Sequence, residues 1–176
     1  MGGFMSTRPI GRAMTTAAAL LAGATMAAPP ARAGDWLADK SGCRVWNPNP
    51  QLEETVTWSG SCANGRAEGQ GIVRWLKGDL PIETDEGEWH DGRQASKGTQ
   101  TWPGGRYDGE LSDGEPNGRG VLTVQNLKYD GEFRNGKPNG PGTLTANGET
   151  VQGIWKDGCL QGRRKASIGI PLSACR

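Results

Sequence analysis

The sequence predicts an all-β protein built as one sheet of consecutive β-hairpins. One stretch, residues 129–146, alternates apolar and polar side chains around a turn signal, as a β-hairpin does. The same pattern then recurs along the chain. Glycine supplies 29 of the 176 residues, and aliphatic side chains are sparse. A thick two-layered core is therefore not expected, and a single sheet with one aromatic face fits the composition better.

The hairpin at residues 129–146 shows the pattern in full. Tyr129 and Phe133 alternate with charged residues, which places the two sets on opposite faces of a strand. Asn135-Gly136 is a strong signal for a tight turn, because both residues tolerate a positive φ. The returning strand alternates again over residues 142–146. One face of this hairpin is therefore apolar or glycine, and the other is charged or hydroxylated.

Four further stretches repeat this unit. A glycine in the first strand marks each copy, and these glycines are Gly60, Gly87, Gly109, Gly131 and Gly153. The last three steps between them are each 22 residues, whereas the first step is 27 residues. A fixed period of this size indicates a repeat array, in which each unit needs its neighbours to bury an apolar face. The longer first step predicts an extra loop around residues 77–81.

The shared pattern, Tyr-x-Gly-x-aromatic-x-Asn/Asp-Gly followed by Gly-x-Gly, resembles the MORN repeat family. The resemblance covers about residues 56–165 and is closest in the two central copies. It implies an all-β, elongated, single-layer antiparallel sheet of about five stacked β-hairpins, capped at both ends. It also implies a class of proteins that has been linked to phospholipid membranes and whose repeats are sometimes fused to catalytic domains.

Five positions depart from this pattern. Asp85, Ser96 and Gln100 stand where the second copy should have tyrosine, glycine and leucine. Cys62 replaces the aromatic residue of the first copy, and Arg164 replaces the last glycine. The resemblance is therefore loosest in the first, second and last copies.

Residues 1–33 are expected to be a signal peptide. Arg8 and Arg12 precede an uncharged stretch rich in alanine, and Ala31-Arg32-Ala33 has the form of a cleavage site. The stretch is shorter and less apolar than the roughly 20 residues that a membrane span needs. An uncleaved anchor or a disordered tail is the alternative. Cleavage predicts an exported chain in the periplasm or cell envelope, or a secreted one.

The rest of the chain divides into three parts. Residues 34–55 are expected to form an N-terminal cap, residues 56–165 the five repeats, and residues 166–176 a C-terminal capping strand or tail. A cap is needed because the ends of a stacked sheet must be blocked against further pairing. In the cap, residues 43–46 form a candidate edge strand. In the tail, apolar residues alternate over 168–172, as a last edge strand would.

Four cysteines lie after the expected signal peptide: Cys43, Cys62, Cys159 and Cys175. An even number in an exported chain indicates disulfides, and three pairings are open. In the stacked array, the pairings Cys43–Cys62 and Cys159–Cys175 each close a short loop at one end. The other pairings would have to span about 50 Å of strands at ~4.8 Å spacing, far beyond what a disulfide bridges. A metal site is disfavoured because no CxxC spacing exists and histidine occurs once.

Evidence for catalysis is weak in this sequence. The single histidine, His90, has no nucleophile motif beside it and is expected to be ordinary surface. Glu88, Glu110 and Glu132 occupy one position in successive repeats, about 10 Å apart, just beyond the spacing of an inverting glycosidase pair. The simpler interpretation is a solvated ladder that pairs with basic residues, of which Arg106, Lys128 and Arg134 are examples. The basic triplet 163–165 is expected to be a solvated turn, with a contact to anionic lipid or glycan as the alternative.

The ring-bearing face is the candidate binding site. It comprises Trp58, Trp89, Tyr107, Tyr129, Phe133 and Trp155. Stacked repeats often present such a surface to a partner. The alternative is that these rings pack on the glycines of neighbouring repeats and form the core. The binding-surface and core interpretations are compatible if a one-layer sheet leaves part of its apolar side uncovered.

The sequence therefore favours a non-enzymatic, exported scaffold that binds a protein partner through its sheet face or edge. The alternative is a module that binds phospholipid at a membrane surface. Loss of Arg8, Arg12 and Arg32 would leave 17 basic against 19 acidic residues, a net charge of −2, and no amphipathic helix is evident. Both features disfavour more than a weak membrane contact. No cofactor, metal or nucleic acid is expected, the last because no basic stripe is present.

Overall fold

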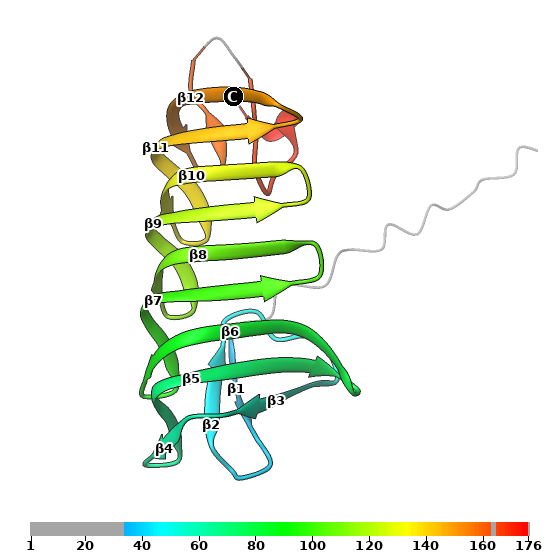
Figure 1. Ribbon diagram of the computed structural model, residues 1–176, viewed down its shortest axis with the longest axis vertical. Coiled ribbons are helices and arrows are strands. Elements are labelled where there is room, and N and C mark those ends of the chain that lie inside the picture. Colours follow the sequence, from blue (N-terminus) through cyan, green and yellow to red (C-terminus); the bar gives the residue numbers. More distant parts are fainter. Residues whose placement is uncertain (1–33, 163–164, 176) are drawn as a thin grey trace, which may run out of the picture. The chain divides into compact units, whose positions relative to one another are not determined.

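The computed structural model describes residues 34–162 and 165–175. The expected signal peptide and two residues of the basic triplet, Arg163 and Arg164, lie outside the described residues. The described chain is almost entirely strand (Figure 1). Its elements are β1 (Asp35–Ala38), β2 (Arg44–Asn47), β3 (Glu54–Trp58), β4 (Ser61–Ala63), β5 (Arg66–Lys77), β6 (Leu80–His90), β7 (Arg93–Trp102), β8 (Gly105–Ser112), β9 (Glu115–Val124), β10 (Leu127–Arg134), β11 (Lys137–Ala146), β12 (Glu149–Lys156), β13 (Cys159–Leu160) and the 3-10 helix η1 (Leu172–Ala174).

The strands β5 to β13 pair antiparallel in chain order and form one open sheet (Figure 1). Each strand is joined to the next by a tight turn, as the repeats predict. At Asn135-Gly136 both φ angles are positive, +48° and +71°, which is the conformation that this pair favours. The prediction of an all-β sheet of consecutive hairpins is therefore confirmed.

A continuous row of glycines crosses the sheet, one on each strand from β5 to β12. The row consists of Gly71, Gly87, Gly98, Gly109, Gly120, Gly131, Gly142 and Gly153, each directly opposite the next. It arises because the 22-residue period brings the two glycines of every repeat into the same register. This glycine row marks the centre line along which neighbouring repeats stack.

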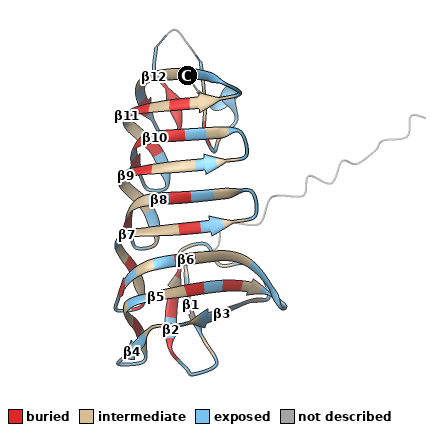
Figure 2. Cartoon of the chain, in the orientation of Figure 1, coloured by how far each residue is buried: buried red, intermediate tan, exposed pale blue. Residues whose placement is uncertain are grey.

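A second row, the tyrosine row, runs beside the glycine row on the same face. Its members are Trp58, Val73, Asp85, Gln100, Tyr107, Leu122, Tyr129, Leu144 and Val151. Buried and exposed residues alternate along the strands, so one face, here called the inner face, carries the core (Figure 2). This alternation is the period of two that the sequence showed.

The turns are also joined to one another. The Gly136 N–H donates to the Pro116 carbonyl at 3.0 Å, and the Gly158 N–H donates to the Pro138 carbonyl at 2.9 Å. Each turn thus binds the repeat before it, outside the ladder hydrogen bonds of the sheet. These bonds fix the stacking of successive hairpins at one edge.

The extra loop expected around residues 77–81 is absent, because the additional residues lengthen the strands instead. β5 has 12 residues and β6 has 11, and only Gly78 and Asp79 lie between them. The first copy also differs from its expected form. Its first strand is split into β3 and β4, which both pair with β5.

The N-terminal cap covers the sheet as well as ending it. β1 and β2 form a hairpin that runs across the direction of the sheet strands (Figure 1). The N–H groups of Arg44 and Trp46 donate to the carbonyls of the turn glycines Gly65 and Gly92 at 3.0 and 2.8 Å. Val45, between them, is fully buried. Two donors of β2 that are two residues apart thus bind the turns of two successive repeats. The cap thereby covers part of the inner face.

The C-terminal tail also differs from the edge strand that was expected. Residues 168–172 contain no strand, and Leu172 begins η1 with its side chain exposed. The Ile168 N–H donates to the carbonyl of the turn glycine Gly158 at 2.9 Å, and the Ile168 side chain is buried. The alternation at 168–172 therefore reflects a segment that crosses the turns, as β2 does at the other end.

Each cap is tied by a disulfide. Cys43 is bonded to Cys62 and Cys159 to Cys175, with Cα separations of 5.9 and 5.6 Å. This is the pairing that places one bridge at each end of the array. Disulfides are typical of oxidising compartments. No helix in the described part of the chain combines the length and the apolar character needed to cross a bilayer.

We expect Gly131→Val to destabilise the protein strongly. A Cβ at Gly131 would lie 2.6 Å from the Tyr129 hydroxyl oxygen and 2.6 Å from the Gly142 Cα atom, so the branched side chain cannot fit without moving the backbone. The free energy of unfolding, measured by thermal or urea unfolding, should fall by about 1–3 kcal/mol or more. Asp130→Ala, on the exposed face one residue away, is the control and should change it by about 0.5 kcal/mol or less. Equal melting temperatures for the two variants would contradict this packing.

We expect reduction of the two disulfides to loosen the caps before the central repeats. The loops have sequence separations of 19 and 16 residues, so each bridge should contribute about 3 kcal/mol. Hydrogen exchange should rise first in β2, β4, β13 and the tail. A uniform rise along the whole chain would show that the bridges do not act locally.

Candidate functional site

The structure places the six predicted ring residues on the inner face, in two separate clusters. Trp58 and Trp89 belong to one cluster, and Tyr107, Tyr129, Phe133 and Trp155 to the other. Five of them, Trp89, Tyr107, Tyr129, Phe133 and Trp155, are at most 4% exposed, and Trp58 is half-buried. These five rings therefore form the core of the sheet and offer little of their own area to a partner. A binding surface on this face has to come from their less buried neighbours.

The tyrosine rings are buried because they lie flat over the glycine row. A Cβ at Gly120 would collide with the Tyr107 ring, and one at Gly142 with the Tyr129 ring. The Tyr107 hydroxyl donates to the Glu110 carbonyl at 2.7 Å, and the Tyr129 hydroxyl donates to the Glu132 carbonyl at 3.2 Å. Burial, helped by the nearby charges of Glu132 and Asp130, raises the pKa of Tyr129 to about 12. These hydroxyl groups act as fixed hydrogen-bond donors.

The rings also contact one another across the repeats. Phe133 lies edge-on between Tyr107 and Tyr129, with centroid distances of 5.1 and 5.2 Å, and Tyr129 contacts Trp155 at 5.2 Å. Each such contact adds about 0.5–1.5 kcal/mol beyond the area that it buries. The ring stack therefore couples the third, fourth and fifth repeats.

Part of the inner face stays open beside this stack. Partly buried apolar side chains of Trp102, Leu122, Val124 and Leu127 line a groove of about 490 Å³. Ile168 of the tail bounds one side of it. This surface is called the open groove below. It is almost wholly apolar. Of the six predicted ring residues, Tyr107 and Phe133 line it, whereas Trp102, Val124 and Leu127 were not singled out from the sequence.

A second hollow lies nearer the N-terminal cap and is strongly acidic. The carboxyl groups of Glu54, Glu83, Asp85 and Glu115 line a pocket of about 230 Å³, called the acidic pocket below. Burial raises the pKa of Asp85 well above its usual value of 3.8, and the charges of Glu83 and Glu54 raise it further. Burial also raises the pKa of Glu83 and of Glu54. Asp85 had been noted only as a departure from the repeat pattern.

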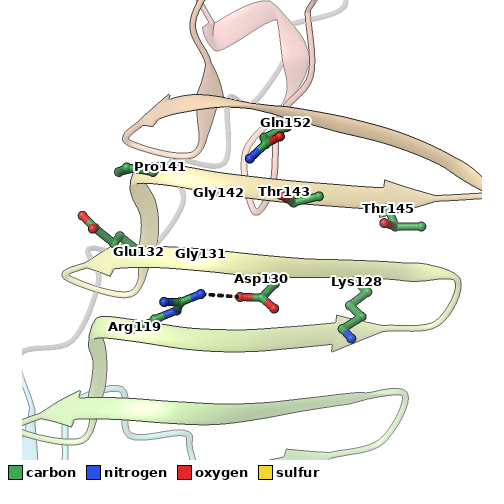
Figure 3. Close-up of a pocket in the computed structure, with 10 residues that line it drawn as sticks. All are labelled: Arg119, Lys128, Asp130, Gly131, Glu132, Pro141, Gly142, Thr143, Thr145 and Gln152. Atoms are coloured by element: carbon green, nitrogen blue, oxygen red, sulfur yellow. Dashed lines mark ion pairs between the residues drawn. The ribbon is translucent and has the colours of Figure 1, made fainter.

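A third hollow, on the opposite face, is shallow and polar (Figure 3). Its volume is about 440 Å³, and its centre is Gly131 and Gly142. Arg119 and Asp130 lie 3.9 Å apart across it, and both are exposed. Such a pair is worth at most about 1 kcal/mol. The balanced charges and exposed position give this hollow no evident selectivity for a ligand.

The residues considered for catalysis are held in local contacts. His90 Nδ1 lies 2.9 Å from Glu68 Oε1 on the surface, and this hydrogen bond raises the pKa of His90. Glu110 Oε2 accepts the Arg119 N–H at 3.2 Å, and Glu132 lies against Gly140. The ion pairs suggested between these glutamates and Arg106, Lys128 or Arg134 do not occur among the described residues. Within residues 34–162 and 165–175, no cluster of His, Cys, Asp and Glu is arranged to hold a metal ion.

We expect Asp85→Asn to stabilise the protein at neutral and alkaline pH but not at acidic pH. The folded-state pKa of Asp85 is raised, so its ionisation penalises folding as the pH rises from the unfolded value toward the folded one. Each unit of difference costs about 1.4 kcal/mol. The melting temperature of the variant should exceed that of the parent by several degrees near pH 8, and the two should converge below about pH 4. A destabilised variant at pH 8 would show that Asp85 is favourably ionised in the fold.

Comparison with known protein families identifies the repeats. The family described as MORN repeat matches residues 86–105, 107–126 and 129–150. These segments run from the second half of β6 to the start of β12, which is the central part of the sheet. No curated protein matches the chain. The chain therefore contains three MORN repeats, and these build the central part of the glycine row and of the ring stack.

Proposed function

We propose that the protein is a non-enzymatic, exported scaffold that binds a protein partner in the open groove. MORN repeats are consistent with a scaffold, and the two disulfides are consistent with an oxidising location. The signal peptide expected at residues 1–33 supports export in the same way. The observation that carries the proposal is the apolar groove in the middle of the inner face.

The groove is open because the two caps reach only the ends of the array. The N-terminal cap extends as far as Pro48, whose ring is near Gly114, and the tail crosses Gly158 and reaches the groove at Ile168. Between them, Trp102 and Leu122 lie on the inner face without such cover. A monomeric protein rarely leaves a contiguous apolar surface of this kind unless it is used.

The chain's own caps indicate which kind of partner would fit. Both are extended segments that donate N–H groups to turn carbonyls and insert an apolar side chain, Val45 or Ile168, toward the core. An extended segment of a partner with apolar residues at every second position would use the same contacts. Edge pairing is less favoured, because β13 at the C-terminal end is only two residues long.

The alternative partner is a membrane surface. The acidic pocket opposes binding to anionic lipid on the inner face. The exposed side chain of Leu172 supplies little apolar area by itself. The crosslinking experiment below distinguishes membrane binding from binding of a protein partner.

Photo-crosslinking in the native envelope tests the proposal. A photoreactive phenylalanine analogue at Leu122, which faces the groove, should give one or a few defined protein adducts. The same residue at Thr123, which is exposed on the opposite face, is the matched control and should give none of them. Trp102→Ala should weaken the Leu122 adducts without changing expression. Adducts of equal yield from both positions, or adducts with lipid alone, would overturn the proposal.

A further inference from the structure

The second repeat differs from its neighbours at three buried positions. In the tyrosine row, Asp85 stands where the next two repeats have Tyr107 and Tyr129, and its register partner Gln100 stands where they have leucine. Gln94 stands opposite Trp89, where the next two repeats have a proline opposite Leu111 or Phe133. All three polar residues are at most 8% exposed. One repeat of the stack has therefore exchanged apolar side chains for hydrogen-bonding ones.

These three side chains all line the acidic pocket. Gln100 Nε2 donates to the Gly114 carbonyl at 2.9 Å, and Gln94 Nε2 donates to the Glu86 carbonyl at 3.2 Å. The amides are thus held by the backbone around the hollow. The exchange does not fill the space that the tyrosine and leucine side chains would occupy, and it leaves a lined cavity on the inner face.

Two polar atoms in the lining have no partner. Asp85 is 4% exposed, and its Oδ2 accepts the Trp75 indole N–H at 2.7 Å, but its Oδ1 accepts no hydrogen bond from any described residue. Trp89 is 2% exposed, and its Nε1–H has no acceptor within the same described part of the chain. Buried polar groups are almost always satisfied in folded proteins. The Asp85 carboxyl also lies within hydrogen-bonding reach of the Glu83 carboxyl. This pair of carboxyl groups and the unpaired Trp89 donor together indicate a ligand with complementary groups.

The charge of the lining defines that ligand further. Four carboxyl groups, from Glu54, Glu83, Asp85 and Glu115, belong to the lining, whereas none of the described lining residues is lysine or arginine. Glu54 is held by Asn47 Nδ2 at 2.8 Å, whereas no lysine or arginine of the described residues forms an ion pair with Asp85 or Glu83. An anion is excluded by repulsion, whereas a cation would favour the ionised carboxylates that burial otherwise opposes.

The indole rings point to the same kind of ligand. Trp46, Trp75 and Trp89 also line the pocket, and the face of an indole ring attracts cations. One of them already does so, because the Arg93 guanidinium lies 4.2 Å from the centroid of the Trp46 ring. An ammonium group carries three donors and fits a site that combines carboxylates with rings.

We propose that the acidic pocket binds a small primary ammonium compound that also carries hydroxyl groups, that is, an amino alcohol or an amino sugar. The ammonium group donates to Asp85 Oδ1 and to Glu83, and a hydroxyl oxygen accepts the Trp89 Nε1–H. The amide groups of Gln94 and Gln100 orient the rest of the molecule. This site adjoins the open groove at Gln100, which lines both, but it does not depend on the proposed scaffold function.

Three matched probes test the site on the oxidised full chain. They are 2-amino-1,3-propanediol, glycerol, which replaces the ammonium group with a hydroxyl, and isopropylamine, which lacks the hydroxyls. Titration is followed by NMR through the seven indole N–H signals. We expect the amino diol to bind at least tenfold more tightly than glycerol and to shift the Trp89 signal. Equal binding of glycerol would overturn the cation site, and no binding of the amino diol would overturn the proposal as a whole.

Variants separate the two recognition elements. Asp85→Asn should weaken binding of the amino diol by at least tenfold, whereas Glu149→Gln, an equal charge change on exposed β12, should leave it unchanged. Isopropylamine should bind more weakly than the amino diol, because it has no hydroxyl to accept the Trp89 Nε1–H, and Trp89→Phe should abolish that difference. If Trp89→Phe perturbs the fold, Gln100→Leu, which restores the residue of the next two repeats, should also weaken binding. An unaltered affinity in Asp85→Asn would contradict the assignment.

The pH dependence gives an independent readout. Protonation of Asp85, Glu83, Glu54 and Glu115 removes the charge that attracts the ligand, while the ammonium group and Arg93 stay charged. Affinity for the amino diol should therefore rise with pH through the raised pKa of Asp85 and then level off. An affinity that does not change between acidic and mildly alkaline pH would show that the carboxyl groups do not hold the ligand.

Discussion

The packing of aromatic rings on a row of glycines is the constraint on which the rest of the structure depends. A one-layer sheet has no second layer to bury its apolar side, so the rings must be buried against the sheet's own backbone. Eight glycines in register provide that space, and Tyr107 and Tyr129 lie in it with their hydroxyls bonded to carbonyls. Each ring then supports its neighbour through edge-on contacts of 5.1–5.2 Å. From the third repeat onward, the core is thus a line of rings in which every repeat needs the next one.

The caps follow from the same constraint. Where the ring stack ends, an apolar surface and a set of turn carbonyls remain, and an extended segment covers both. β2 does this at Gly65 and Gly92, and the tail does it at Gly158. Each segment is short, and a disulfide holds it in place. The uncovered middle of the inner face is the open groove, which is therefore a property of how far the two caps reach.

The repeats, their turns and the residues of the ring stack could be predicted from the sequence, because period, turn chemistry and alternation are local signals. The path of the two capping segments could not be predicted. β2 and the tail form hydrogen bonds to turn carbonyls, and no side-chain pattern in the sequence marks these backbone groups. The alternation at 168–172 was misassigned to an edge strand for that reason. The acidic pocket was visible in part, since Asp85 and Gln100 broke the repeat pattern. The assembly of this pocket could not be predicted, because Glu54, Glu83 and Glu115 come from three strands and meet only in the folded sheet.

The caps recognise backbone groups of the turns, and those groups are the same in every repeat. A chain that gained or lost one 22-residue unit between the capped ends would keep both disulfides and both cap contacts. Two strands at about 4.8 Å spacing would lengthen or shorten the sheet by about 10 Å. The length of the open groove would change by the same amount for each repeat gained or lost. Duplication or deletion of a repeat could therefore give related proteins whose binding surfaces differ in length while the two capped ends stay the same.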